Sequence, residues 1–344
     1  MSEPDRSGGE AALSEAEIQL LATLAAATGQ SEPTGRANLA RLGGRDYEDY
    51  LEDWSDAFDS LAGKGLLAEQ DGHYALTADG ARCAPACRAE RPGLWWYLYR
   101  DFFTAAPSSA AHAVFCERVY GRDLCQHGMV DMDELAKLLE VLQLAPGHRV
   151  LELGCGNGVI TEHIADLTGA RITGIDYAPV AIEQAQHRTA EKSDRLVFQV
   201  GDMNALDLPQ AAFDAAMSID TLYFVDDLHA TLSRTIPSLK PGGQMGIFFA
   251  QWLEAGDPQE LLQADQTRLA GVLGDLGLSY RTWDFTVNIR RHWRLNKQAS
   301  EDLKSRFEAE GNGFLYAFRE REWQEFLPLV EARAISHHLY HVRL

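Results

Sequence analysis

Apolar and polar positions follow two different patterns along this chain. Between residues 13 and 90 the apolar positions recur every three or four residues, a spacing typical of amphipathic helices. From residue 146 to residue 250 short apolar runs alternate with helical stretches, which predicts βαβ units around a buried parallel sheet. Strands are predicted in this region at residues 150–153, 171–176, 196–200, 213–219 and 244–250. The pattern therefore favours an α/β core preceded by a helix-rich module.

The limits of these patterns divide the 344 residues into five predicted parts. Residues 1–12 are polar and acidic, and we expect them to be a disordered tail. Residues 13–90 form the helix-rich module, and residues 91–145 form a helical lid or linker. The core covers residues 146–250, and residues 251–344 complete it and add helices that cap a substrate site.

The helix-rich module is predicted to contain three helices and a hairpin. The helices cover residues 13–27, 36–42 and 47–64, and the hairpin turns at Asp71-Gly72. This order is that of a winged helix. The first 90 residues hold 17 acidic and seven basic side chains, so a nucleic-acid backbone would be repelled. We therefore expect the module to serve dimerisation or to cover a substrate.

A glycine-rich segment at the end of the first core strand carries the strongest chemical signal. Residues 150–158 read Val-Leu-Glu-Leu-Gly-Cys-Gly-Asn-Gly, and a helical stretch follows. A strand, a glycine turn and a helix form the front half of a nucleotide-binding unit. A dinucleotide site has the spacing G-x-G-x-x-G, whereas here the carboxylate of Glu152 precedes three glycines at alternate positions. Such a carboxylate would repel a pyrophosphate and suits a cationic ligand without phosphate.

This segment resembles the first motif of class I S-adenosylmethionine (SAM)-dependent methyltransferases, and further landmarks of that family follow in order. An acid, Asp176, ends the second predicted strand, and Gly201-Asp202-Met203 follows the third. The resemblance implies SAM as the cofactor and a doubly wound, Rossmann-like sheet of seven strands whose last strand lies antiparallel beside the fifth. It also implies a set of cofactor-binding residues, namely Glu152, Gly154, Gly156, Asn157, Asp176, Tyr177, Asp202, Met203 and Ser218.

The residues just before the core resemble the lid segment of phosphoethanolamine and related small-amine N-methyltransferases. Cys116 and Leu124 stand where that family has two tyrosines, which argues against a phosphobase substrate. The polar groups that remain there are Tyr120, Gln126 and His127. We expect Tyr120 and His127 to take part in catalysis and Gln126 to contact the substrate.

Two further segments are expected to face the acceptor. The loop after the fourth core strand supplies Asp220 as a substrate contact and Tyr223 as a catalytic candidate. Residues 93–104 are rich in aromatic side chains, which stabilise a desolvated cation such as a sulfonium and can exclude water. The histidines near the C-terminus, including His337 and His338, are expected to be structural rather than catalytic.

Composition narrows the class of substrate. The formal net charge is −20, and a nucleic-acid-modifying enzyme would instead present a basic face. No apolar run reaches 18 residues, and the start of the chain does not resemble a secretory signal. The five cysteines are scattered and odd in number, so we expect free thiols, a cytoplasmic protein and no metal site.

The sequence therefore predicts a cytoplasmic, SAM-dependent methyltransferase that acts on a nitrogen or oxygen of a small molecule, without nucleic-acid or membrane partners. A homodimer through the N-terminal module is compatible with this prediction. Two alternatives stay open. The same cofactor can react through its aminobutyryl carbons, by transfer or by cyclisation, with release of methylthioadenosine. Alternatively, the chain is a non-enzymatic winged-helix regulator whose SAM site is vestigial.

Overall fold

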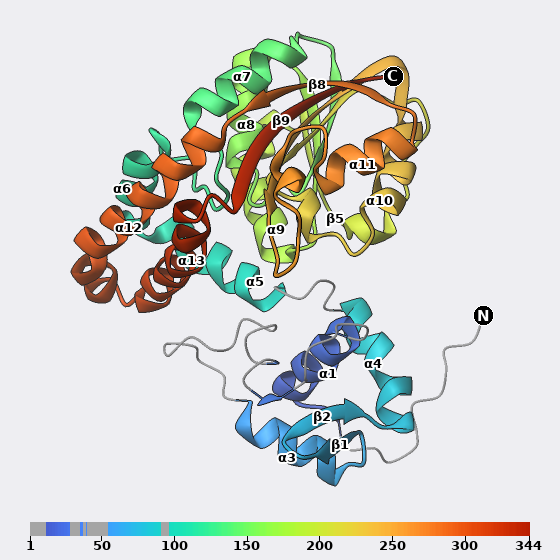
Figure 1. The fold of residues 1–344 in the computed structure, drawn as a ribbon, viewed down its shortest axis with the longest axis vertical. Helices are drawn as coiled ribbons and strands as arrows, with labels where there is room; N and C mark the ends of the chain where they lie inside the picture. Colours follow the sequence, from blue (N-terminus) through green and yellow to red (C-terminus); the bar gives the residue numbers. More distant parts are fainter. Residues whose placement is uncertain (1–11, 28–34, 37–38, 40–53, 91–95) are drawn as a thin grey trace. The chain divides into compact units, whose positions relative to one another are not determined.

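The computed structural model divides the chain into two compact units, Met1–Leu98 and Tyr99–Leu344. It describes all residues except 1–11, 28–34, 37–38, 40–53 and 91–95, which Figure 1 draws as a thin grey trace. Among the described residues, no helix combines the length and the apolar character needed to cross a bilayer.

The smaller unit has its own apolar core, built from helices and a two-stranded hairpin. Its described elements are α1 (Glu15–Ala27), α3 (Ser55–Gly63), β1 (Leu67–Gln70), β2 (His73–Leu76) and α4 (Ala78–Glu90). A capping box begins α1: the Ser14 amide donates to Glu17 Oε2 at 2.6 Å, and the Glu17 amide donates to Ser14 Oγ at 3.3 Å. The hairpin turns at Asp71-Gly72, with φ of 52° and 77°, as predicted.

The winged-helix order stays a prediction. Residues 40–53 lie outside the described part of the chain, and they include the end of the second predicted helix and the start of the third. The third helix, α3, is described from Ser55 onward.

The larger unit is built on one mixed sheet of seven strands. They are β3 (Arg149–Leu153), β4 (Arg171–Asp176), β5 (Leu196–Val200), β6 (Phe213–Ile219), β7 (Leu239–Trp252), β8 (Ser279–Asp284) and β9 (Ile335–Arg343). Their order is β5-β4-β3-β6-β7-β9-β8, and β9 runs antiparallel to both of its neighbours. The predicted doubly wound sheet, with its last strand beside the fifth core strand, is therefore confirmed.

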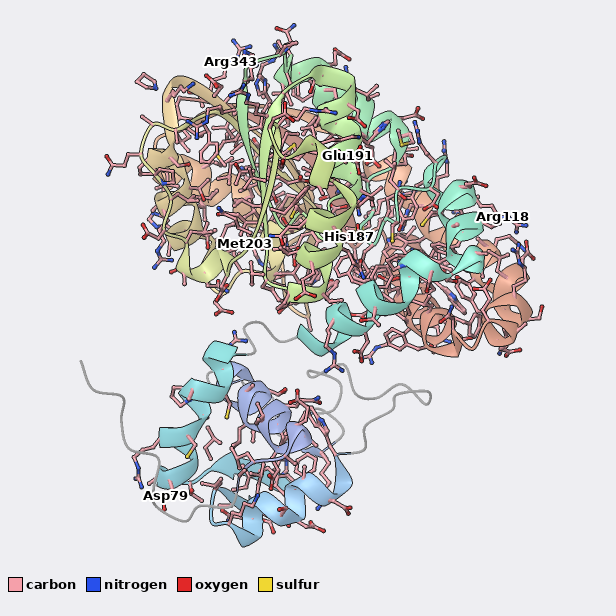
Figure 2. The ribbon with its side chains drawn as sticks, turned by 180° about the vertical axis from the view of Figure 1, so that it is seen from behind. Asp79, Arg118, His187, Glu191, Met203 and Arg343 are labelled. Atoms are coloured by element: carbon pink, nitrogen blue, oxygen red, sulfur yellow. The ribbon has the colours of Figure 1, made fainter. Side chains whose placement is uncertain are left out.

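Helices cover both faces of this sheet, as the apolar runs in its strands require. The helices on one face are α7 (Met132–Leu142), α8 (Val159–Thr168) and α9 (Pro179–Arg188). The helices on the other face are α10 (Leu228–Thr235) and α11 (Arg268–Asp275). Figure 2 labels Met203, just after the carboxyl end of β5, and Arg343, at the end of the antiparallel strand β9, at opposite ends of the larger unit.

Four more helices stand beside one end of the sheet. They are α5 (Trp96–Ala105), α6 (Ala110–Tyr120), α12 (Thr286–Ala309) and α13 (Gly313–Glu331). Helix α12 packs against α6 and α13, and Figure 1 shows the three side by side. Helix α12 begins at Thr286, and its buried face includes Ile289 and Trp293.

Short 3-10 helices connect these elements. They are η1 (Ala106–Ser108), η2 (Ala190–Lys192), η3 (Met203–Ala205), η4 (Leu222–Phe224), η5 (Ile236–Ser238) and η6 (Gln259–Leu262). Helix α11 begins at Arg268 and is capped by Thr267, whose side chain accepts from the Ala270 amide.

Candidate active site

The glycine loop after β3 is shaped by close contacts that leave no room for side chains. Gly154 and Gly156 have φ of 75° and 53°, in the left-handed region that favours glycine. A Cβ atom on Gly154 would lie 2.4 Å from Thr221 Cγ2, and one on Gly156 would lie 2.8 Å from Phe103 Cζ. The loop therefore packs tightly between Thr221, which follows Asp220, and Phe103 of the aromatic helix α5.

Two buried carboxyl groups organise this loop. Asp176, at the end of β4, accepts hydrogen bonds from the Gly156 amide at 2.8 Å and from the Ala178 amide at 2.9 Å. Glu152, within β3, accepts from Thr161 Oγ1 at 2.5 Å. Burial raises the pKa of Glu152 to about 7 and also raises the pKa of Asp176. A cationic ligand beside these groups would favour their ionised forms.

The loop forms one wall of a cavity of about 930 Å³, open solvent at its mouth included. Ten of the residues that the sequence predicted for the site line this cavity: Gln126, His127, Glu152, Gly154, Gly156, Asn157, Asp176, Tyr177, Met203 and Asp220. They come from segments more than 90 residues apart, and the carboxyl ends of the parallel strands bring them together.

Aromatic side chains form a second part of the wall. The Tyr99 ring lies 4.8 Å from the His127 ring, 5.8 Å from the Phe224 ring and 6.1 Å from the Tyr177 ring, measured between centroids. Helix α5 is held to the core by Gln184, whose Nε2 donates to the Phe103 carbonyl at 2.8 Å. The sequence predicted an aromatic cover from residues 93–104, and two members of that segment, Tyr99 and Phe103, line the cavity.

A third part of the wall comes from residues 126–131, which we call the lid segment and of which Gln126, His127, Gly128 and Val130 line the cavity. Within it, His127 is the candidate proton acceptor. Its ring stacks on Phe318 with a centroid distance of 5.0 Å, and its Nε2 lies 3.5 Å from Glu322 Oε1. That contact is too long for a hydrogen bond in this structure, and Nδ1 is the nitrogen left for the cavity side. Burial and the nearby Arg319 hold the pKa of His127 well below its usual range, so the ring is neutral at pH 7.

A fully buried arginine from α13 fixes the backbone around His127. Arg319 Nη2 donates to the Gln126 carbonyl at 2.8 Å, and Nη1 donates to the His127 carbonyl at 3.3 Å. Nη1 also donates to Glu322 Oε2 at 2.8 Å. Sequence reasoning did not find Arg319 or Glu322, because nothing in α13 shows that it packs on a segment about 190 residues earlier.

Two of the predicted catalytic residues do not line the cavity. Tyr120 is buried, and its hydroxyl donates to the Gly128 carbonyl at 2.8 Å. The Tyr223 ring packs on Phe249 and Trp252, and burial raises the pKa of its hydroxyl well above the usual range. Both tyrosines therefore hold structure together here, and we do not assign either of them a catalytic role.

Other predicted polar residues have their side chains engaged within the protein. The side-chain Oε1 of Gln126 accepts from the backbone amide of Leu124, and its Nε2 donates to the Arg122 carbonyl. The Gln126 side chain therefore stabilises the turn before the lid segment. Ser218 is buried away from the cavity and pairs with Thr221 Oγ1 at 2.7 Å. Asp202 caps η3 by accepting from the Asn204 amide, and its predicted contact with the cofactor stays a prediction.

Several lining residues were not singled out from the sequence. Thr221 donates to the Leu153 carbonyl at 2.7 Å and fills the space left by Gly154. Cys125 and Phe224 also line the cavity. Thr221 and Phe224 could have been found from their place in the loop after β6, but the sequence analysis chose their neighbours Asp220 and Tyr223.

The electrostatic character of the cavity is acidic and apolar. Among its lining residues, three are acids (Glu152, Asp176 and Asp220), and none is lysine or arginine. The glycine cradle, the acid at the end of β4 and the aromatic cover are features that a sulfonium-bearing nucleoside would require. The residues present therefore fit SAM, and they do not fit a ligand that must be held through phosphate groups.

Comparisons with known proteins agree with this geometry. Residues 150–243 match the family described as methyltransferase domain. The chain is 31% identical over 150 residues to 27-O-demethylrifamycin SV methyltransferase of Amycolatopsis mediterranei (strain S699), covering 40% of this chain and 54% of that protein. The chain thus spans about half the length of that relative.

Solved structures show the same fold at low identity. The cyclase SpnF superposes with a TM-score of 0.56 at 21% identity, covering 73% of this chain and 94% of that one. A phosphoethanolamine N-methyltransferase 2 of Haemonchus contortus, in complex with SAM, gives a TM-score of 0.53 at 18% identity, with coverage of 71% and 59%.

The larger unit thus contains a class I SAM-dependent methyltransferase domain, as the sequence predicted. The cofactor of such a domain is SAM. Its acceptor does not follow from the fold, because proteins of this fold carry out different reactions.

Proposed function

We propose that the protein transfers the methyl group of SAM to an oxygen or nitrogen of a small, uncharged and largely apolar molecule, with His127 accepting the displaced proton. The observation that carries this proposal is a cavity that joins the glycine-loop carboxyl groups to a neutral histidine and whose described lining residues include no lysine or arginine. Among these residues a phosphorylated acceptor would find no guanidinium or ammonium group.

The residues that would hold SAM are those of the glycine loop, with Asp176 available to its ribose hydroxyls and Met203 and Tyr177 beside its base. SAM, when bound, supplies an electrophilic methyl group and leaves as S-adenosylhomocysteine. Displacement of this kind requires the acceptor atom to be held close and in line with the methyl carbon. The aromatic residues Tyr99, Phe103 and Phe224 would exclude water while this alignment is held.

His127 would then take the proton of the acceptor O–H or N–H as the new bond to carbon forms. A neutral imidazole can accept this proton at Nδ1, and the carboxyl group of Glu322 near Nε2 would stabilise the imidazolium that results. The proposal keeps His127, which was also chosen from the sequence, and assigns no part in proton transfer to Tyr120 or Tyr223.

We further propose that residues 13–90 act as a dimerisation module rather than as a nucleic-acid-binding one. Its described helices and hairpin share a closed apolar core that includes Leu20, Leu21 and Leu61. The acidic excess of this part of the chain would repel phosphate. A mass measurement in solution, with and without residues 1–90, tests this assignment.

The function is tested with methyl-labelled SAM and matched pairs of uncharged and phosphorylated alcohols, phenols and amines. We expect label transfer and S-adenosylhomocysteine release with uncharged acceptors only. His127→Asn should lower kcat by about 10²–10⁴-fold, with S-adenosylhomocysteine affinity within about threefold of the wild type. Methylthioadenosine released from SAM alone would overturn methyl transfer, and unchanged kcat in the variant would remove His127 from the chemistry.

A further inference from the structure

Three buried side chains behind the lid segment form one hydrogen-bonded chain. His337, on β9, lies between Asp220, after β6, and Glu134, on α7. Its Nε2 is 2.8 Å from Asp220 Oδ1, and its Nδ1 is 3.0 Å from Glu134 Oε1. All three residues are at most 3% exposed. The imidazole thus bridges two carboxyl groups out of contact with water.

Each carboxyl group uses its other oxygen to hold the backbone of the lid segment. Asp220 Oδ2 accepts from the Met129 amide at 2.7 Å and from the Val130 amide at 3.1 Å. Glu134 Oε2 accepts from the Asp131 amide at 2.8 Å. Three consecutive backbone amides therefore donate to two carboxyl groups, and both of these carboxyl groups are also hydrogen-bonded to His337.

The charge on the histidine makes this arrangement stable in a dry environment. Burial alone would lower the pKa of His337, but the Asp220 and Glu134 carboxyl groups outweigh it and raise this pKa to about 10. The ring is then protonated at neutral pH, and both of its nitrogens donate. Without this cation, two acids would be buried side by side with no compensating charge.

The same contacts change the interpretation of Asp220. The sequence predicted it as a substrate contact, and it does line the cavity. Both of its carboxylate oxygens are engaged by His337 and by the lid segment, and its φ of 57° places it in the left-handed region. A Cβ atom on Gly128 would lie 3.0 Å from the Asp220 side chain, so the lid segment sits directly on this residue.

We propose that His337 is a positioning residue of this enzyme. Through Asp220 and Glu134 it holds the amides of residues 129–131, and so it keeps Gly128 and His127 in their places in the cavity wall. The role rests on the proposed function only in that the cavity is the place of reaction. Arg319 and Tyr120 hold the carbonyl groups of residues 126–128 from the other side, so the amide half of the segment depends on His337.

The test compares His337→Gln with His338→Gln in the full chain. His338 is the next residue of β9 and is also buried, but its side chain points to the opposite face, where Nε2 contacts the Leu262 carbonyl at 3.0 Å. The readouts are site-resolved amide hydrogen exchange at pH 7 and the Kd of S-adenosylhomocysteine by calorimetry. Neither readout needs the acceptor to be known.

In His337→Gln we expect the amides of residues 129–131 to exchange at least tenfold faster, while amides of β3, β4 and β6 stay within twofold of the wild type. The Kd of S-adenosylhomocysteine should rise at least fivefold. His338→Gln should change neither quantity by more than twofold. Unchanged protection at residues 129–131 in His337→Gln, or an equal loss in His338→Gln, would overturn the proposal.

A milder variant keeps the proposal testable if His337→Gln does not fold. Glu134→Leu removes the acceptor of the Asp131 amide and leaves the pair of His337 and Asp220 in place. Only the Asp131 amide should then lose protection, while Met129 and Val130 keep theirs. A uniform loss over residues 129–131 would contradict the assignment of separate acceptors. If these exchange results hold but no methyl transfer is found, the proposed function fails and the positioning role of His337 stands.

Discussion

The two walls of the cavity are built in different ways. The glycine loop and Asp176 form a wall from residues within one stretch of about two dozen positions, linked by a strand, a turn and a helix. The lid segment is held by Arg319, Asp220 and His337 across separations of 90 to 203 residues, and only the bond from the Asp131 amide to Glu134 is local. The first wall is therefore local and the second is tertiary, so they should respond differently to mutation and to pH.

The largest effect is expected on the lid side. Arg319→Met removes a buried cation that pairs with Glu322 at 2.8 Å and donates to the backbone carbonyls of Gln126 and His127. Breaking a buried ion pair from one side costs about 3–5 kcal/mol, and we expect the free energy of unfolding to fall by that amount. Urea denaturation measures it. The double variant Arg319→Met/Glu322→Gln should recover part of the loss, and equal stability of wild type and single variant would show that the pair is not needed.

A second difference should appear at alkaline pH. The pKa of His337 is about 10 in the folded state against an ordinary value of 6.5, so its stabilisation is fully present below pH 6.5 and is lost as the pH rises through 10. The titratable groups that face it are Asp220, Glu134 and, from α12, His292.

We expect the free energy of unfolding of the wild type to fall by a few kcal/mol between pH 7 and pH 10, since one pKa unit corresponds to about 1.4 kcal/mol. His337→Gln should lack this component of the slope. Urea denaturation at each pH measures the free energy of unfolding. If this free energy changes with pH in the same way in the wild type and in the variant, the ring is not charged at neutral pH.

On the glycine-loop side the expected loss is in cofactor affinity rather than in stability. Asp176→Ala should weaken SAM binding by about 1–3 kcal/mol, because the carboxylate no longer orders the Gly156 amide or meets the ribose hydroxyls. Calorimetry measures this loss. The control is Asp194→Ala, which replaces an exposed acid and should bind SAM like the wild type. Unchanged affinity in Asp176→Ala would mean that the ribose lies elsewhere.

The same contrast explains what could be predicted from the sequence. The core strands, the glycine loop and Asp176 follow from local patterns, whereas the arrangement of the sheet followed from the family resemblance. The structure places the loop and Asp176 together at the carboxyl ends of β3 and β4. The packing of α13 on the lid segment depends on which apolar faces meet after folding, and no local pattern specifies that. His337 was expected to be structural, but its two acidic partners come from distant elements and leave no signal in the sequence around it.

The smallest expected effect separates the two walls by the direction of their pH dependence. Burial raises the pKa of Glu152 to about 7, so in the free protein this carboxyl group is largely protonated at pH 6 and largely ionised at pH 8. A cationic cofactor favours the ionised form, so SAM affinity should fall by up to about tenfold as the pH falls from 8 to 6. Glu152→Gln, which can still accept from Thr161 but carries no charge, should give a SAM affinity that is nearly independent of pH over this range.

The effect of His337 appears only above pH 7. The pH dependence below pH 7, the acid branch, therefore reports on the glycine-loop wall, and the pH dependence above pH 7, the alkaline branch, reports on the lid segment. A variant that kept the acid branch would show that another group governs it, and SAM binding by calorimetry from pH 6 to pH 8 decides the point.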